Sequence, residues 1–124
     1  RASGGWLDVA VTEHRLLVDI AHGYDVLIMG AHKWAQVNDP RYYGDDERAR
    51  DDAVAALPEL AIAPRPPFAV PQDAALSLPP QHAAVSSSAV RAGERAWMSP
   101  AAAEFDIRTG AWSDPERYLR WVTG

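Results

Sequence analysis

The sequence predicts an α/β protein with a partial, doubly wound parallel sheet, flanking helices and a C-terminal helical segment. Strand-like and helix-like patterns alternate twice within residues 7–63, which is typical of βαβ units. The segment Asp25–Met29 (DVLIM) is apolar after its first residue, which is typical of a strand covered on both faces of a parallel sheet. We therefore expect parallel strands near residues 7–11, 25–30 and 59–63, with a short fourth strand near residues 82–85.

Helix signals lie between and after these strands. Thr12 suits the N-cap of a first helix, and either Asp45 or Asp46 suits that of a later one. Either Ser113 or Asp114, followed by Pro115 and Glu116, is a strong start for the last helix. We expect helices over residues 12–21, 31–37, 46–57 and 86–92, and from residue 115 onward. This order of elements is Rossmann-like.

Residues 64–80 interrupt the pattern with six of the chain's ten prolines. Proline lacks the N–H that a central strand donates, so this stretch cannot be one. We expect a stiff, extended surface loop or a mobile lid within a single domain that spans residues 1–124.

Composition narrows the classes of function. The net charge of −5 argues against a general nucleic-acid surface, which needs a basic face. There is no cysteine, and no apolar run approaches the ~20 residues that span a bilayer. We expect a cytoplasmic protein that binds neither nucleic acid nor membrane.

The segment from Gly30 to Trp34 is the first candidate binding site. A strand that ends in Gly30 and Ala31 lets a ligand approach the backbone closely, and α/β sheets bind ligands at the carboxyl ends of their strands. His32, Lys33 and Trp34 would then supply a hydrogen-bonding group, a cation and a stacking face. The alternative is that Trp34 belongs to the core and that His32 and Lys33 are solvated.

A second candidate lies at Ser86, Ser87 and Ser88, followed by Arg91. Hydroxyls and N–H groups at a helix start favour an anion, and the Arg91 guanidinium suits a phosphate. The alternative is one serine cap beside a solvated arginine. The acidic residues of 45–52 are interpreted as a solvated helix face. No metal site is assigned, because His14 and His22 have no third ligand in register.

Together these segments resemble the nucleotidyltransferase superfamily, specifically the nicotinate and nicotinamide mononucleotide adenylyltransferases. The family has a Gly-Ala-Asp segment after a central strand, here GAHKW from Gly30. It has an Arg-Pro pair after a later strand, here Arg65-Pro66, and a late Ile-Ser-Ser-Thr-x-x-Arg motif, here VSSSAVR. The resemblance covers residues 25–93. It implies that Ser86, Ser87 and Arg91 contact ATP phosphates, that Ser88 replaces the threonine, and that the Gly30 segment lies against the ribose.

The resemblance implies adenylyl transfer from ATP to a mononucleotide with release of pyrophosphate, in NAD biosynthesis, and Mg²⁺ would accompany the ATP. Two differences are plain. His32 stands where the family has aspartate, and the family's early Gly-rich turn with His-x-Gly-His is absent. We therefore expect the C-terminal, nucleotide-binding half of such an enzyme, and assign no catalytic residue. The alternative is a non-catalytic nucleotide-binding or scaffold fragment that needs a partner segment, either a complementary chain or a homo-oligomer.

Overall fold

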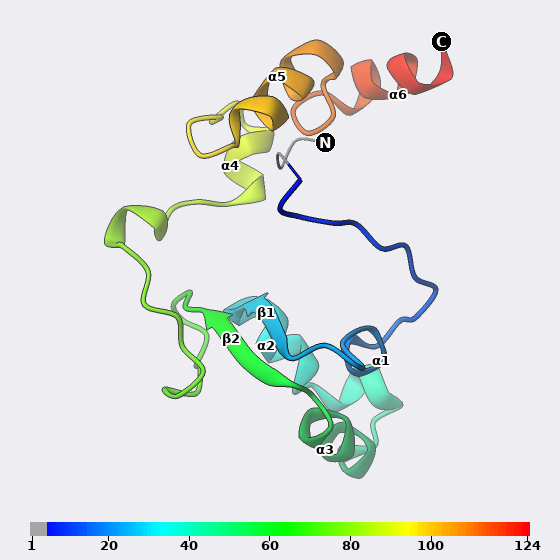
Figure 1. The fold of residues 1–124 in the computed structure, drawn as a ribbon, viewed down its shortest axis with the longest axis vertical. Coiled ribbons are helices and arrows are strands. Elements are labelled where there is room, and N and C mark those ends of the chain that lie inside the picture. The colour runs from blue at the N-terminus through cyan, green and yellow to red at the C-terminus, as the bar shows by residue number, and fades with distance from the viewer. Residues whose placement is uncertain (1–4) are drawn as a thin grey trace. The chain divides into compact units, whose positions relative to one another are not determined.

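The computed structural model describes residues 5–124, which form two compact units. Residues 11–83 make up one unit, and residues 84–124 with the N-terminal stretch to Ala10 make up the other. Within residues 5–124 there are six α-helices and one two-stranded parallel sheet, so the mixed α/β class is confirmed. Figure 1 labels the elements.

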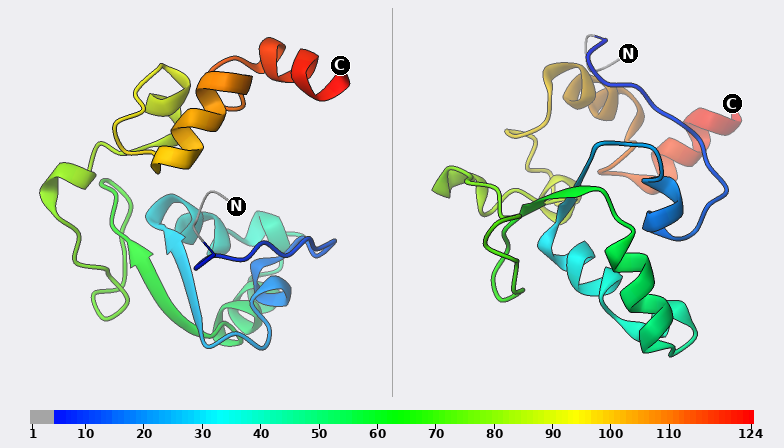
Figure 2. Two further views of the ribbon diagram at one scale, coloured as in Figure 1. Left: turned by 45° about the horizontal axis from the view of Figure 1, so that its top comes forward. Right: turned by 60° about the horizontal axis from the view of Figure 1, so that its bottom comes forward.

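The unit of residues 11–83 contains the sheet. Its strands and helices are α1 (Leu17–Ile20), β1 (Val26–Gly30), α2 (Ala31–Val37), α3 (Glu47–Ala55) and β2 (Glu59–Ala63), and its two 3₁₀ turns are η1 (Pro40–Tyr43) and η2 (Pro80–His82). Strands β1 and β2 run side by side in the same direction, as Figure 2 shows, with Val26 opposite Glu59 and Gly30 opposite Ala63. The connection between them contains α2 and α3, as a parallel crossover requires.

The core of this unit lies between one face of the sheet and the helices. Met29, Ala31, Val37 and Ile62 form this core cluster, and Leu27, Leu60 and Val54 are among the partly buried residues packed against it. On the other face Val26 and Ile28 are 46% and 71% exposed. The prediction that β1 is covered on both faces is therefore wrong for this structure.

Two predicted strands do not form. Residues 7–15 contain no helix or strand, and α1 begins only at Leu17, although the Thr12 hydroxyl accepts a hydrogen bond from the His14 N–H (3.1 Å). A strand needs a neighbour for its backbone groups, and residues 7–11 have no strand partner within residues 5–124.

Residues 82–85 also differ from the expected strand. Pro79 and Pro80 favour a tight turn, and the N–H groups of His82 and Ala83 bond to their carbonyls at 3.0 and 3.1 Å. The chain is therefore turned back at η2, where a strand would need an extended backbone.

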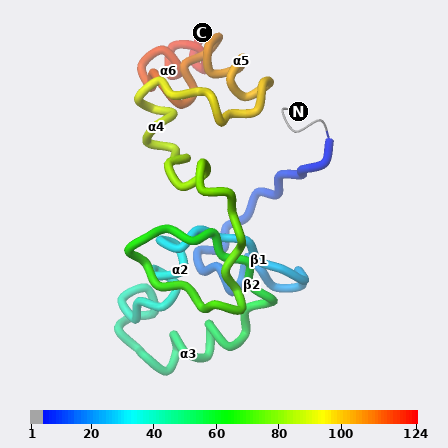
Figure 3. The backbone as a smooth tube through the Cα atoms, turned by 90° about the vertical axis from the view of Figure 1, so that its left-hand side faces the viewer, coloured from blue at the N-terminus to red at the C-terminus, as the bar shows by residue number. Residues whose placement is uncertain are grey.

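The proline-rich segment 64–80 contains neither helix nor strand before η2, as predicted. It returns alongside β2, where the Ile62 N–H donates to the Ala74 carbonyl (2.8 Å) and the Leu76 N–H donates to the Ile62 carbonyl (2.9 Å). Figure 3 follows this part of the chain in green. The segment therefore occupies the outer edge of β2.

The other unit consists of three helices: α4 (Ser87–Arg91), α5 (Pro100–Thr109) and α6 (Pro115–Thr123). Each follows a side-chain cap, from Ser86, Ser99 and Asp114 respectively. The helices predicted from Ser86 and from residue 115 are confirmed. Of the alternatives that the sequence left open, Asp46 caps α3 and Asp114 caps α6.

Candidate functional site

The carboxyl end of the sheet brings together two of the predicted site segments. Gly30 and Ala63 lie opposite each other at the last register position of β1 and β2. Gly30 is also the N-cap of α2, and Arg65 comes two residues after β2. No atom beyond its chain neighbours lies within 4 Å of a Cβ added at Gly30, so the backbone there is open to an approaching molecule.

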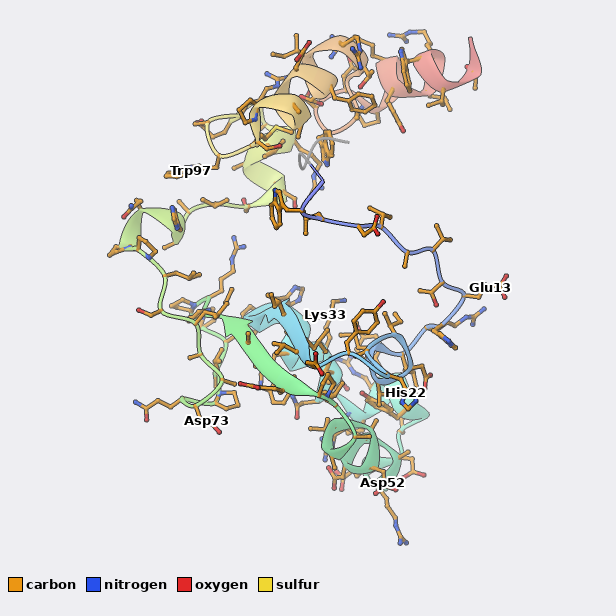
Figure 4. The ribbon with its side chains drawn as sticks, in the orientation of Figure 1. Glu13, His22, Lys33, Asp52, Asp73 and Trp97 are labelled. Atoms are coloured by element: carbon orange, nitrogen blue, oxygen red, sulfur yellow. The ribbon has the colours of Figure 1, made fainter. Side chains whose placement is uncertain are left out.

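The first turn of α2 has one buried and two exposed side chains. Ala31 is fully buried, whereas His32 and Lys33 are exposed. The Lys33 Nζ donates to Gln36 Oε1 at 2.6 Å, and Figure 4 labels this lysine beside the end of β1. The exposure of His32 and Lys33 fits both interpretations of this segment. A ligand-binding site needs side chains that a ligand can reach, and the alternative has both side chains in solvent.

Trp34 lies differently. Its side chain is half-buried and packs against the core cluster. Its carbonyl accepts the Asn38 side-chain amide (2.8 Å), which fixes the end of α2. Much of the Trp34 indole therefore contacts the core, and less of it is free to stack on a ligand as predicted.

Phe68 joins this site, although sequence analysis did not select it. The Phe68 N–H donates to the Arg65 carbonyl (3.0 Å) and closes a four-residue turn directly after β2. The turn brings the Phe68 ring to the His32 ring, with centroids 5.1 Å apart and planes inclined at 40°. The one feature of the sequence that could have indicated Phe68 is that it is a lone aromatic residue shortly after Arg65.

Charge is polarised along the sheet. Asp25 and Glu59 lie at its amino end, and Lys33 and Arg65 lie at its carboxyl end. Residues 11–83 as a whole carry eleven Asp and Glu against six Lys and Arg, and Asp52 and Asp73 in Figure 4 belong to this acidic majority. An anion is therefore attracted to the carboxyl end more than to the rest of this unit.

The predicted serine–arginine segment lies in the other unit. Ser86 is the N-cap of α4, and its hydroxyl accepts the Ala89 N–H (3.1 Å). Ser87, Ser88 and Arg91 are exposed, and an Arg91 Nη2 donates to Ser88 Oγ at 3.4 Å. Gly30–Trp34 and Arg65 thus form one group, and Ser86–Arg91 forms a second. The convergence of the two groups on one ligand stays a prediction.

The best-formed polar cluster in the chain was not predicted. Asp106 on α5 is fully buried and accepts from Arg95 Nε (2.7 Å), Ser113 Oγ (2.8 Å) and the Trp112 N–H (2.8 Å). Burial raises the pKa of Asp106, but the hydrogen bonds from Trp112, Arg95 and Ser113 outweigh it and hold that pKa well below its usual range. Because every contact ties α5 to its flanking loops, we interpret the cluster as structural.

No group of three or more His, Asp or Glu side chains within residues 5–124 could hold a metal ion. In the same stretch no helix is both long and apolar enough to cross a bilayer. Comparison with known protein families, with curated proteins and with solved structures gave no match. The functional interpretation of the candidate site therefore rests on the geometry of the site.

Proposed function

We propose that this chain binds a nucleotide and acts as a nucleotidyltransferase, or as the nucleotide-binding half of one. The observation that supports this most is the pairing of Gly30 with Ala63, which sets the Gly30–Trp34 segment and Arg65 at one end of a parallel sheet. Ligands of α/β proteins bind at that end. The open backbone at Gly30 and the cations Lys33 and Arg65 suit a phosphorylated ligand.

The proposed reaction is adenylyl transfer. A phosphate oxygen of a mononucleotide, such as nicotinate or nicotinamide mononucleotide, would attack the α-phosphorus of ATP, and the bond to pyrophosphate would break. Arg65 and Lys33 would bind phosphate oxygens at the carboxyl end of the sheet. Mg²⁺ would accompany the ATP. Residues 5–124 offer it no ligand cluster, so no step is assigned to the ion.

Calorimetric titration with ATP tests the proposal. We expect Arg65→Ala to weaken ATP binding about tenfold or more, because it removes a charge-assisted contact to phosphate. Arg48→Ala is the matched control, because Arg48 is an exposed arginine of the same unit. An equal loss in the control variant, or no ATP binding by the unmodified chain, would contradict the proposal.

A second candidate function is nucleotide binding without catalysis. His32 favours it, because a neutral imidazole has one acceptor nitrogen where a carboxylate would accept from both ribose hydroxyls. An assay of pyrophosphate release with a panel of mononucleotides separates the two: the enzyme releases pyrophosphate, whereas the binding protein retains ATP affinity without turnover.

A further inference from the structure

We propose that the His32–Phe68 ring pair is the surface on which the planar ring of a nucleotide stacks. This inference rests on the proposed nucleotide-binding function and names the part of the site that recognises the base. It assigns the stacking role to a residue of the proline-rich segment, which no sequence motif indicated.

The two rings form one aromatic surface. His32 is exposed and Phe68 is 38% exposed, so part of each ring faces solvent. Their centroids lie 5.1 Å apart with an inclination of 40°, which puts the rings in contact without stacking one face fully on the other. An incoming heteroaromatic ring can therefore lie against the exposed parts of both.

Trp34 is less suited to this role. Its indole is half-buried against the core cluster of Met29, Ala31, Val37 and Ile62. A residue that packs against the core has little free face to offer a ligand, and moving it would expose apolar surface to water. The exposed aromatic surface at the carboxyl end of the sheet thus belongs to His32 and Phe68.

The surroundings of the pair suit an anionic, ring-bearing ligand. Arg65 begins the turn that ends at Phe68, and within residues 5–124 its side chain forms no ion pair. Lys33 follows His32 directly, and its ammonium group donates to the neutral amide of Gln36 and, within residues 5–124, forms no ion pair. A stacking surface flanked by two cations that lack carboxylate partners matches the two chemical parts of a nucleotide, the base and its phosphates.

The experiment titrates the full 124-residue chain with three probes by calorimetry: adenosine, ATP and inorganic tripolyphosphate. Phe68→Leu should weaken the binding of adenosine and ATP about tenfold and leave tripolyphosphate unchanged, since stacking involves only the base. His32→Ala should weaken adenosine likewise, whereas His32→Phe should restore it. Tyr42→Leu is the matched control, because Tyr42 is an exposed aromatic of the same unit, 56% exposed.

The outcomes separate this inference from the proposed function. Adenosine affinity that is unchanged in Phe68→Leu overturns the stacking surface, and so does an equal loss of tripolyphosphate binding. If Arg65→Ala weakens ATP binding and Phe68→Leu does not, phosphate binding stands and the stacking surface falls. If adenosine depends on Phe68 but tripolyphosphate does not bind, the surface stands and nucleotidyl transfer falls. A chain that binds none of the probes overturns both.

Discussion

Asp106 shows how one buried carboxylate can decide local stability. Its Oδ2 accepts from both Arg95 Nε and Ser113 Oγ, and its Oδ1 accepts from the N–H groups of Trp112 and Ser113. All four donors point at one fully buried side chain. This cluster could not be predicted from the sequence, because Asp106 resembles an ordinary polar position on a helix and its donors lie in loops, which have no periodic pattern.

The substitution Asp106→Asn should destabilise the chain by about 3 kcal/mol, because it places an amide NH₂ group against two donors and leaves Arg95 without its carboxylate. We take the lower end of the usual range since the Arg95 side chain is 32% exposed. Urea denaturation measures the loss. Asp46→Asn is the control: it changes the same group at a helix N-cap, where asparagine is as good as aspartate. Equal losses in both variants would contradict the structural role of the cluster.

The low pKa of Asp106 also predicts how stability depends on pH. Since the folded-state pKa lies below the unfolded value near 3.8, the unfolded chain takes up the proton first as the pH falls. The stabilisation is thus complete at neutral pH and is lost progressively below about pH 5. The difference in unfolding free energy between the unmodified chain and Asp106→Asn should shrink between pH 5 and pH 2. A constant difference would show that the charge of Asp106 is not what stabilises the cluster.

Among the elements, those with local signals were predicted best. Asp46, Ser86 and Asp114 each accept a backbone N–H at the start of a predicted helix. The sequence had left Asp45 as an alternative to Asp46 and Ser113 as an alternative to Asp114. Strands β1 and β2 follow from their apolar runs. The failures at residues 7–11 and 82–85 have another origin, because a strand exists only with a partner, and pairing depends on residues distant in sequence.

The two faces of the sheet give an element-level prediction. Ile62 is fully buried, whereas Ile28 is 71% exposed, although both are isoleucines in apolar strands. We expect Ile62→Val to cost about 1 kcal/mol of unfolding free energy, and Ile28→Val to stay within about 0.3 kcal/mol of the unmodified chain.

Denaturant titration of the two isoleucine variants in parallel makes the comparison. The same methylene is removed from the same residue type in each, so the difference reports burial alone. Equal costs would mean that the face of β1 bearing Ile28 is covered in solution.

At the level of the whole chain, the sequence predicted the class of fold but not its extent. The mixed α/β class is confirmed. Residues 5–124 contain a two-stranded parallel sheet, and a larger, doubly wound sheet stays a prediction. At the site, the proximity of Gly30 and Arg65 could be predicted from the sequence. Gly30 ends one parallel strand and Arg65 follows the end of the other. Phe68 could not be placed, because its position depends on the hydrogen bond that closes the turn from Arg65.

The distribution of charge over the chain predicts selectivity between free nucleotides and nucleic acid. Residues 11–83 have an acidic excess, and residues 84–124 carry five Asp and Glu against five Lys and Arg, so neither stretch has a basic excess. A polynucleotide binds when several of its phosphates meet protein cations and the counterions condensed on its own backbone are released, whereas a mononucleotide needs only a few cations at one place. We therefore expect ATP to bind while a 20-nucleotide single-stranded DNA does not, at about 10 μM chain and 0.15 M salt.

Fluorescence anisotropy of labelled DNA tests this selectivity, with labelled ATP as the positive control. DNA binding that weakens steeply with added salt would mean that a basic surface operates in solution, and the exclusion of nucleic acid would be wrong.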